Sequence, residues 1–214
     1  MKTCIISVAF REPYITHSAT QDIRICEEIE EGLNCDLLYF RDQLPMKDEI
    51  FTGEDIIPEF QKSLYGFKPH AIQRAIDMGY EKVIWLDPSV LPTVSMQVLI
   101  DSLDENPMIV ITGDAPITKM CSDKAFDWFE LERSELEGVN HIGGTMYAFN
   151  FTDKKVRDVF DLWKRAEQNG IFGTQDEFMK GHWSDEACMV LAMHKCRMPQ
   201  YKEEKFTYLN QKEI

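Results

Sequence analysis

The sequence predicts an α/β domain with a mostly parallel central sheet and helices on both of its faces. Short runs rich in β-branched residues alternate with amphipathic segments along the whole chain, as in parallel α/β folds. The run Val83–Leu86 is apolar throughout, which is typical of a strand buried on both faces. No repeat, low-complexity tract or linker interrupts residues 1–214, so a single domain is expected.

The first part of the chain predicts two strands separated by a helix. Residues 3–10 form a β-branched run that reads as a first strand. Apolar residues at helical spacing predict a surface helix over Thr20–Glu31, with Gly32 at its C-cap. Cys35–Phe40 is the next strand. Residues 41–58 carry Asp, Pro and Gly without a clear period, so a long loop with a short helix toward Phe60 is expected.

The middle of the chain continues the alternation. Pro69 suits the first turn of a helix that closes at Gly79. The strand Lys82–Leu86 follows, and then a helix capped by Ser95. Met108–Thr112 predicts another strand, which Gly113-Asp114 is expected to end in a turn.

The last part predicts one strand and three helices. The segment Ser122–Leu136 is acidic but places its apolar residues together, so we expect a helix. The strand Thr145–Phe151 precedes a strongly amphipathic helix over Asp153–Asn169, which Gly170 ends. Ser184 opens a last helix through Cys196, apolar on every face over Ala187–Met193 and therefore expected in the core.

Composition narrows the possible partners and the compartment. With 23 basic and 37 acidic residues the net charge is −14, which disfavours a nucleic-acid or anionic membrane surface but permits a small anionic ligand. No apolar run approaches the length of a membrane span, and the amino-terminal run is too short and interrupted for a signal peptide. The six cysteines show no C-x-x-C pairing, so reduced thiols and a cytoplasmic location are expected.

Asp87 is the first candidate for a functional residue. It ends the buried run Lys82–Leu86, and Pro88 stops the strand there. Ligands of open α/β sheets bind outside the carboxyl ends of the strands, where a carboxylate can hold a metal–diphosphate or a sugar hydroxyl. The alternative is an Asp-Pro turn that only ends a strand.

Two further segments carry polar groups that could reach the same edge. Lys68 stands at the start of a helix, a favourable place for phosphate, although a solvated lysine beside Pro69 is the simpler interpretation. The pair Gly143-Gly144 would let the backbone approach a ligand, or would only make a turn. His141 could hydrogen-bond a sugar or phosphate, or serve as a structural histidine.

The start of the last helix carries the carboxylates Asp185 and Glu186. Acidic residues in a first turn favour the helix dipole, which explains them without any function. However, a buried helix whose polar end opens into a cleft could present a general base, a nucleophile or a group that stabilises positive charge at a sugar carbon. Trp183 beside them could stack on a sugar face.

In this order and spacing, the three segments resemble the GT-A class of nucleotide-sugar glycosyltransferases, from Lys68 to about Pro199. The stretch from Lys68-Pro69 through Gly79 to Asp87 looks like the segment that leads into the Asp-x-Asp motif of that class. The stretch from His141 to Asn150 is similar to its strand beside the donor sugar. Asp185-Glu186 resembles the paired element of retaining glycogenin-like and blood-group-type transferases, and matches an inverting-type base less closely.

The resemblance implies a GT-A, Rossmann-like fold and a role for each of these residues. Donor-binding residues would be Val8, Ala9, Phe10, Tyr14, Lys68, Asp87, Ser89, Gly143, Gly144 and Trp183, with Arg11 as an alternative to Tyr14. Asp185 or Glu186 would act near the anomeric carbon. Asp87 would sit at the diphosphate, with a Mn²⁺ or Mg²⁺ ion if one is used. The second carboxylate of Asp-x-Asp is here Ser89, and neither His182 nor His194 is a convincing histidine ligand, so metal use stays open.

The sequence therefore predicts a glycosyltransferase that moves a sugar from a nucleotide-diphosphate donor to an acceptor hydroxyl of unknown identity. Retention of configuration is weakly favoured by Asp185-Glu186. One alternative is a nucleotide-sugar-binding protein on the same fold that has lost turnover, which Ser89 motivates. A nucleotidyltransferase is disfavoured, because Phe10-Arg11-Glu12-Pro13-Tyr14 stands where a Gly-rich basic loop would follow the first strand.

Overall fold

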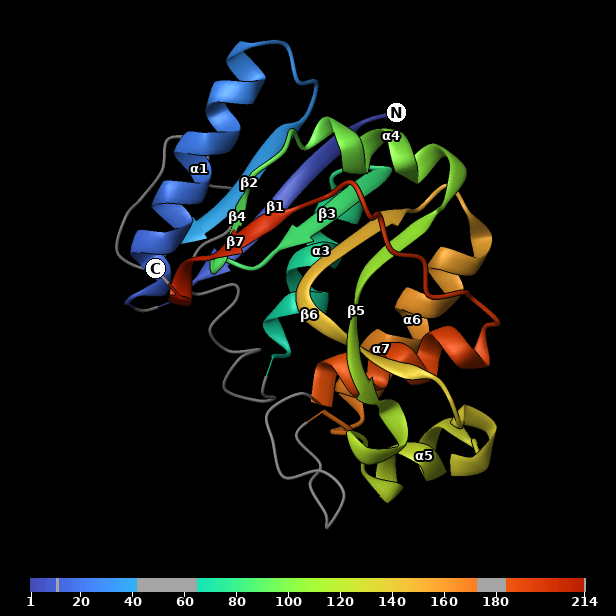
Figure 1. Cartoon of the computed structure of the whole chain (residues 1–214). Coiled ribbons are helices and arrows are strands. Elements are labelled where there is room, and N and C mark those ends of the chain that lie inside the picture. Colours follow the sequence, from blue (N-terminus) through green and yellow to red (C-terminus); the bar gives the residue numbers. More distant parts are fainter. Residues whose placement is uncertain (11, 42–64, 173–183, 214) are drawn as a thin grey trace.

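A central sheet of five strands organises the chain in this computed structural model, which describes residues 1–10, 12–41, 65–172 and 184–213. The strands lie in the order β2-β1-β3-β6-β5 (Figure 1). Their bounds are β1 Thr3–Ala9, β2 Asp36–Arg41, β3 Lys82–Leu86, β5 Met108–Pro116 and β6 Asn140–Asn150. β1 pairs in parallel with β2 and β3, whereas β6 is antiparallel to both β3 and β5. Only β6 therefore runs against the other four strands, and the predicted mostly parallel sheet is confirmed.

Helices cover both faces of this sheet. They are α1 Tyr14–Glu30, α3 Phe67–Asp77, α4 Gln97–Glu105, α5 Asp123–Phe129, α6 Lys154–Gln168 and α7 Ser184–Lys195. Buried residues of α1 and α4 pack on one face, and those of α3, α5, α6 and α7 on the other. Along β1 and β3 alternate side chains enter the two cores, with Ile5 and Ile84 on one side and Ile6 and Trp85 on the other.

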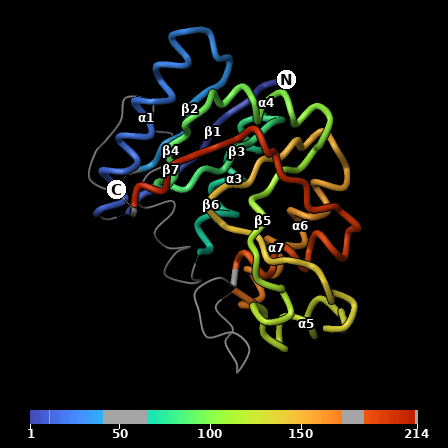
Figure 2. The backbone as a smooth tube through the Cα atoms, in the orientation of Figure 1, coloured from blue at the N-terminus to red at the C-terminus, as the bar shows by residue number. Residues whose placement is uncertain are grey.

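A second small sheet, absent from the sequence prediction, ties the C-terminal residues to the main sheet. β4 (Val90–Pro92) pairs with β7 (Tyr208–Asn210) in antiparallel fashion. β7 brings the C-terminal end beside the start of α1 (Figures 1 and 2), where the Gln211 side-chain amide donates to the His17 carbonyl at 3.0 Å. Three-residue strands are too short to carry a period-2 pattern, which is why sequence reasoning missed them.

Three sequence expectations need correction. Gly113-Asp114 is not a terminal turn, because β5 continues to Pro116 through two irregularities in its pairing with β6. The segment Ser122–Leu136 is two helices, since Glu130 adopts a left-handed conformation after α5 and a 3₁₀ helix follows at Arg133–Leu136. Gly143-Gly144 lies within β6, not in a loop before it.

The remaining elements agree with expectation to within a few residues, except that α1 begins at Tyr14 instead of Thr20. Ala187–Met193 of α7 is buried at every position, as predicted. The expected loop over 41–58 falls outside the described residues, apart from Arg41, which belongs to β2.

The carboxyl ends of β1 and β3 mark the natural binding edge of this sheet. The chain passes from β1 to β2 on one side and later to β3 on the other side of β1. Strand order thus reverses between β1 and β3, and ligands of open α/β sheets bind at such a point. Asp87 stands directly after β3 at this edge.

Candidate functional site

A buried ion pair joins the first turns of α3 and α7. The Lys68 Nζ atom lies 2.6 Å from Asp185 Oδ2, and the two side chains are 4% and 1% exposed. Nζ also donates to the Gly144 carbonyl on β6 at 3.1 Å. The same carbonyl accepts the indole N–H of Trp85 at 3.3 Å. The Gly144 carbonyl thereby connects β6 to α3 and β3, and through Lys68 also to α7.

Neighbouring groups compensate the buried charge of Lys68. Burial alone would lower the pKa of its ammonium, but the carboxylates of Asp185 and Glu186 outweigh burial and raise that pKa. The faces of Tyr65 and Trp85 lie 4.9 and 5.8 Å from Nζ. Lys68 is therefore a protonated, fully engaged cation and not the solvated lysine of the simpler interpretation.

Asp185 is buried behind the site. Burial raises the pKa of its carboxyl to about 6, Lys68 opposes that rise, and Glu186 adds to it. The backbone carbonyl of Asp185 accepts the indole N–H of Trp163 on α6 at 2.8 Å. Asp185 thus lies in the core with Lys68 as its counter-ion.

Glu186 is the more accessible of the two carboxylates. Its side chain is 13% exposed, and its oxygens face two donors on β6. Oε1 accepts the Gly144 N–H at 2.6 Å, and Oε2 lies 3.3 Å from His141 Nε2. Of the two predicted catalytic carboxylates, Glu186 is therefore the one in a position to face a substrate.

Gly144 and Gly143 differ in their surroundings although both belong to β6. A Cβ atom on Gly144 would lie 2.6 Å from Glu186 Oε1 and 2.8 Å from Lys68 Nζ, so the cluster leaves no room for a side chain. A Cβ on Gly143 would make ordinary contacts with Ile111 and Thr145 at 3.7 Å. Only Gly144 is brought to the carboxylates.

Asp87 and Ser89 form a tight turn at the end of β3. Asp87 Oδ1 accepts both the Ser89 N–H at 2.9 Å and the Ser89 hydroxyl at 2.6 Å. The Asp87 N–H donates to Thr145 on β6 at 2.8 Å, and the Gln21 amide donates to the Asp87 carbonyl at 2.9 Å. The turn therefore lies beside the Gly144 segment of β6.

The hydrogen bonds of this turn bear on whether the Asp87 carboxylate could bind the expected metal ion. Both hydrogen bonds from Ser89 go to Asp87 Oδ1, so Oδ2 is the oxygen of this carboxylate that would face a metal. Within the described ranges no group of three His, Cys, Asp or Glu side chains could hold a metal ion. We assign no step of the reaction to a metal.

The residues predicted to meet the nucleotide lie at the end of β1 and the start of α1. Val8 and Ala9 are buried in the sheet. The ring of Phe10 packs on Phe67 with centroids 5.1 Å apart, which connects it through Phe67 to Trp85. Tyr14 lies near the C-terminal end, with Lys212 Nζ 4.9 Å from the centre of its ring.

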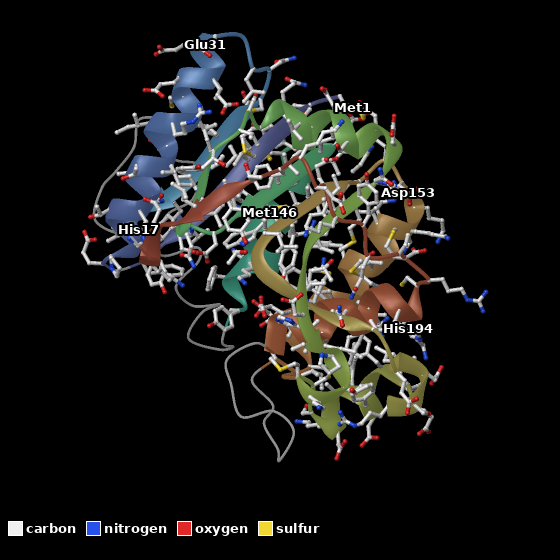
Figure 3. All side chains as sticks on the ribbon, in the orientation of Figure 1. Met1, His17, Glu31, Met146, Asp153 and His194 are labelled. Atoms are coloured by element: carbon white, nitrogen blue, oxygen red, sulfur yellow. The ribbon has the colours of Figure 1, made fainter. Side chains whose placement is uncertain are left out.

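Other predicted residues are elsewhere. Arg11, His182 and Trp183 fall outside the described residues. His194 is in the last turn of α7, at the end opposite to the carboxylates, and Figure 3 shows it on the side of the molecule away from His17. It takes no part in the cluster.

Sequence reasoning missed several members of the cluster. Trp85 was visible only as part of a strand, and Trp163 as one apolar position of an amphipathic helix. Tyr147 on β6 is fully buried, yet its hydroxyl has no hydrogen-bond partner among the described residues. Burial, followed by Asp185 and Glu186, raises the pKa of this phenol well above its usual value. A polar residue in a strand predicted to be buried on both faces was the available signal for Tyr147.

No family model matches the chain, and no curated protein matches its sequence. Among solved structures, an active-site mutant of LgtC is 13% identical over 88% of this chain and 70% of its own, with a TM-score of 0.50. The chain has the GT-A fold. The fold class predicted from the sequence is confirmed.

Two other solved structures are similar at lower TM-scores. WbbM, a bifunctional glycosyltransferase, is 10% identical over 96% of this chain with a TM-score of 0.49. The present chain covers only 41% of WbbM. Mouse xyloside xylosyltransferase 1 is 10% identical over 94% of this chain and 85% of its own, with a TM-score of 0.48. No helix within the described part of the chain is long and apolar enough to cross a membrane.

Proposed function

We propose that the chain is a glycosyltransferase-like domain that transfers a sugar from a nucleotide-diphosphate sugar to an acceptor hydroxyl. The observation that carries this proposal is the cluster of Lys68, Gly144, Asp185 and Glu186 beside the Asp87 turn. This cluster lies near the strand-order reversal where open sheets bind ligands. The shared fold with LgtC, which has been solved with donor and acceptor sugar analogues, supports the same function.

In this proposal the reaction exchanges two bonds at the anomeric carbon. The bond from that carbon to the diphosphate oxygen breaks, and its electron pair leaves with the diphosphate. The acceptor oxygen forms the new bond and gives up its proton to the departing diphosphate. Positive charge develops on the sugar in between, and a fixed carboxylate stabilises such a centre.

We assign that carboxylate to Glu186, since Asp185 is 1% exposed and already neutralised by Lys68. Lys68 then does not bind the diphosphate directly, which departs from the role expected for it at the sequence level. It holds the first turns of α3 and α7 together and sets the charge around Glu186. Retention of configuration, a cytoplasmic location and binding of the donor by Val8, Ala9, Phe10, Tyr14, Asp87, Ser89, Gly143, Gly144 and Trp183 stay predictions.

A panel of nucleotide sugars, with and without Mn²⁺ and with varied acceptors, tests the proposal. The expected result is thermal stabilisation by one donor together with release of the nucleoside diphosphate. Glu186→Gln should keep the stabilisation and lose release by about 100-fold or more, because only the charge near the sugar carbon is removed.

Glu31→Gln at the exposed end of α1 (Figure 3) is the matched control and should behave as wild type. Stabilisation without release for any acceptor would favour the binding-only alternative. If no donor either stabilises the protein or releases a nucleoside diphosphate, the proposed function is wrong.

A further inference from the structure

Two donors on β6 hold the Glu186 carboxylate from both sides. The Gly144 N–H lies 2.6 Å from Oε1, and His141 Nε2 lies 3.3 Å from Oε2. The His141 and Glu186 side chains are 18% and 13% exposed, so water competes little for this contact. A carboxylate with a single anchoring donor can still rotate about its last bond, whereas two donors fix its plane.

The other ring nitrogen of His141 indicates which tautomer is present. Nδ1 is shielded from water and has no hydrogen-bond partner in the described part of the chain. A hydrogen on Nδ1 would be a buried donor without an acceptor, which is costly. The environment therefore fits a ring with its hydrogen on Nε2, where it is donated to Glu186.

Gly113 on β5 provides the space for this ring. A Cβ atom at residue 113 would lie 2.4 Å from His141 Nδ1 and 2.5 Å from Cε1. The backbone of Gly113 does not adopt a positive φ, so glycine is not needed there for its conformation. The close approach of the imidazole accounts for the glycine. A side chain at this position and the observed placement of the His141 ring exclude each other.

We propose that His141 is a positioning residue that fixes the orientation of Glu186, and that Gly113 keeps open the space its ring requires. This inference rests on the proposed function, in which Glu186 faces the sugar carbon. Without the His141 donor, Oε2 would be a nearly buried carboxylate oxygen that has lost its hydrogen bond to β6. The side chain would then turn toward water and leave the position in which it stabilises the reacting centre.

The first test separates turnover from binding. His141→Ala is expected to lower kcat about 10- to 100-fold, the range for loss of one hydrogen bond to a charged group, with donor KM changed less than threefold. His141→Gln, which restores an N–H donor of similar reach, should recover kcat to within about fivefold of wild type. His194→Ala, at the other end of α7, is the control and should leave both parameters unchanged.

The second test uses Gly113. Gly113→Ala should lower kcat about as much as His141→Ala, because the added methyl displaces the ring. In a His141→Ala background the same change should cost less than twofold further. Losses that multiply instead, or a His141→Ala enzyme with wild-type kcat, would overturn the inference.

A readout without turnover separates this inference from the proposed function. The ¹⁵N resonances of the His141 ring should report hydrogen on Nε2 in the wild-type protein. They should shift in both Glu186→Gln and Gly113→Ala, because the first replaces the charged acceptor of the ring N–H by a neutral amide and the second displaces the ring. If no donor is ever turned over, the proposed function fails, but these shifts still decide whether His141 holds Glu186. Ring resonances that stay unchanged in both variants would show that His141 does not hold Glu186.

Discussion

Replacing Lys68 by Met removes the cation of the buried pair while keeping an unbranched side chain that is only one heavy atom shorter. In the wild type, Nζ lies 2.6 Å from Asp185 Oδ2, and both side chains are almost fully buried. Removing one partner of a buried pair costs about 3–5 kcal/mol, because the other charge is left without compensation. For a chain of this size that corresponds to a fall in Tm of about 6–20 °C.

The stability lost in Lys68→Met should depend on pH, and the direction of this dependence follows from the pKa of Asp185. Its folded pKa of about 6 lies above the ordinary value for Asp, so the native state holds this proton more tightly than the unfolded state. Stability contributed by Asp185 is therefore largest at acid pH and falls as pH rises toward 6. Without Lys68 the pKa of Asp185 rises further, so the fall continues above pH 6. We expect Lys68→Met to be far more destabilising at pH 8 than at pH 5.

Thermal unfolding of the wild type and the variant at pH 5, 6.5 and 8 measures this difference. The double variant Lys68→Met/Asp185→Asn should be more stable than Lys68→Met at pH 8, because no buried charge remains. Lys154→Met is the control, since that lysine is 77% exposed in an ion pair on α6 and should contribute little. Equal destabilisation at pH 5 and pH 8, or a double variant less stable than the single one, would refute the reasoning.

Two further substitutions probe the same edge of the sheet. Gly144→Ala should lower kcat about 100-fold and also lower Tm, because its methyl would meet Glu186 and Lys68 at 2.6 and 2.8 Å; wild-type kinetics would contradict the described packing. Asp87→Asn keeps the oxygen that accepts from Ser89, so Tm should change by less than about 3 °C, while loss of the charge should weaken donor binding roughly tenfold. Isothermal titration with and without Mn²⁺ measures that affinity. A loss of affinity only in the presence of Mn²⁺ would assign Asp87 to a metal. Unchanged affinity under both conditions would show that Asp87 does not belong to the donor site.

The sequence predicted the sheet well because most of its strands are recognisable from their apolar and β-branched residues. β3 was found at its observed bounds, since Val83–Leu86 is apolar and Asp87-Pro88 ends it. β5 and β6 were shortened because Gly113 and Gly143-Gly144 look like turns when pairing partners are unknown. In the structure these glycines lie in long strands, and the ones at 113 and 144 are explained by neighbours distant in sequence.

Those neighbours could not be foreseen from local pattern. His141 and Glu186 are 45 residues apart, and they meet because α7 packs against β6. Lys68 and Asp185 are 117 residues apart and meet because α3 and α7 begin at the same edge of the sheet. Each contact depends on register and helix placement, which a period of 2 or 3.6 does not encode.

Helix geometry nevertheless required the two carboxylates to take different roles. Successive side chains on a helix point about 100° apart, so Asp185 and Glu186 could not both face a cleft from a helix packed against the sheet. The one turned inward needs a counter-charge, because an unpaired buried carboxylate is costly. Lys68 is that counter-charge, and in the proposed reaction it does not contact the diphosphate. Lys68 and Asp185, which look like separate ligand-binding signals in the sequence, form one structural ion pair in three dimensions. In the proposed reaction Glu186 is then the single carboxylate that faces the substrate.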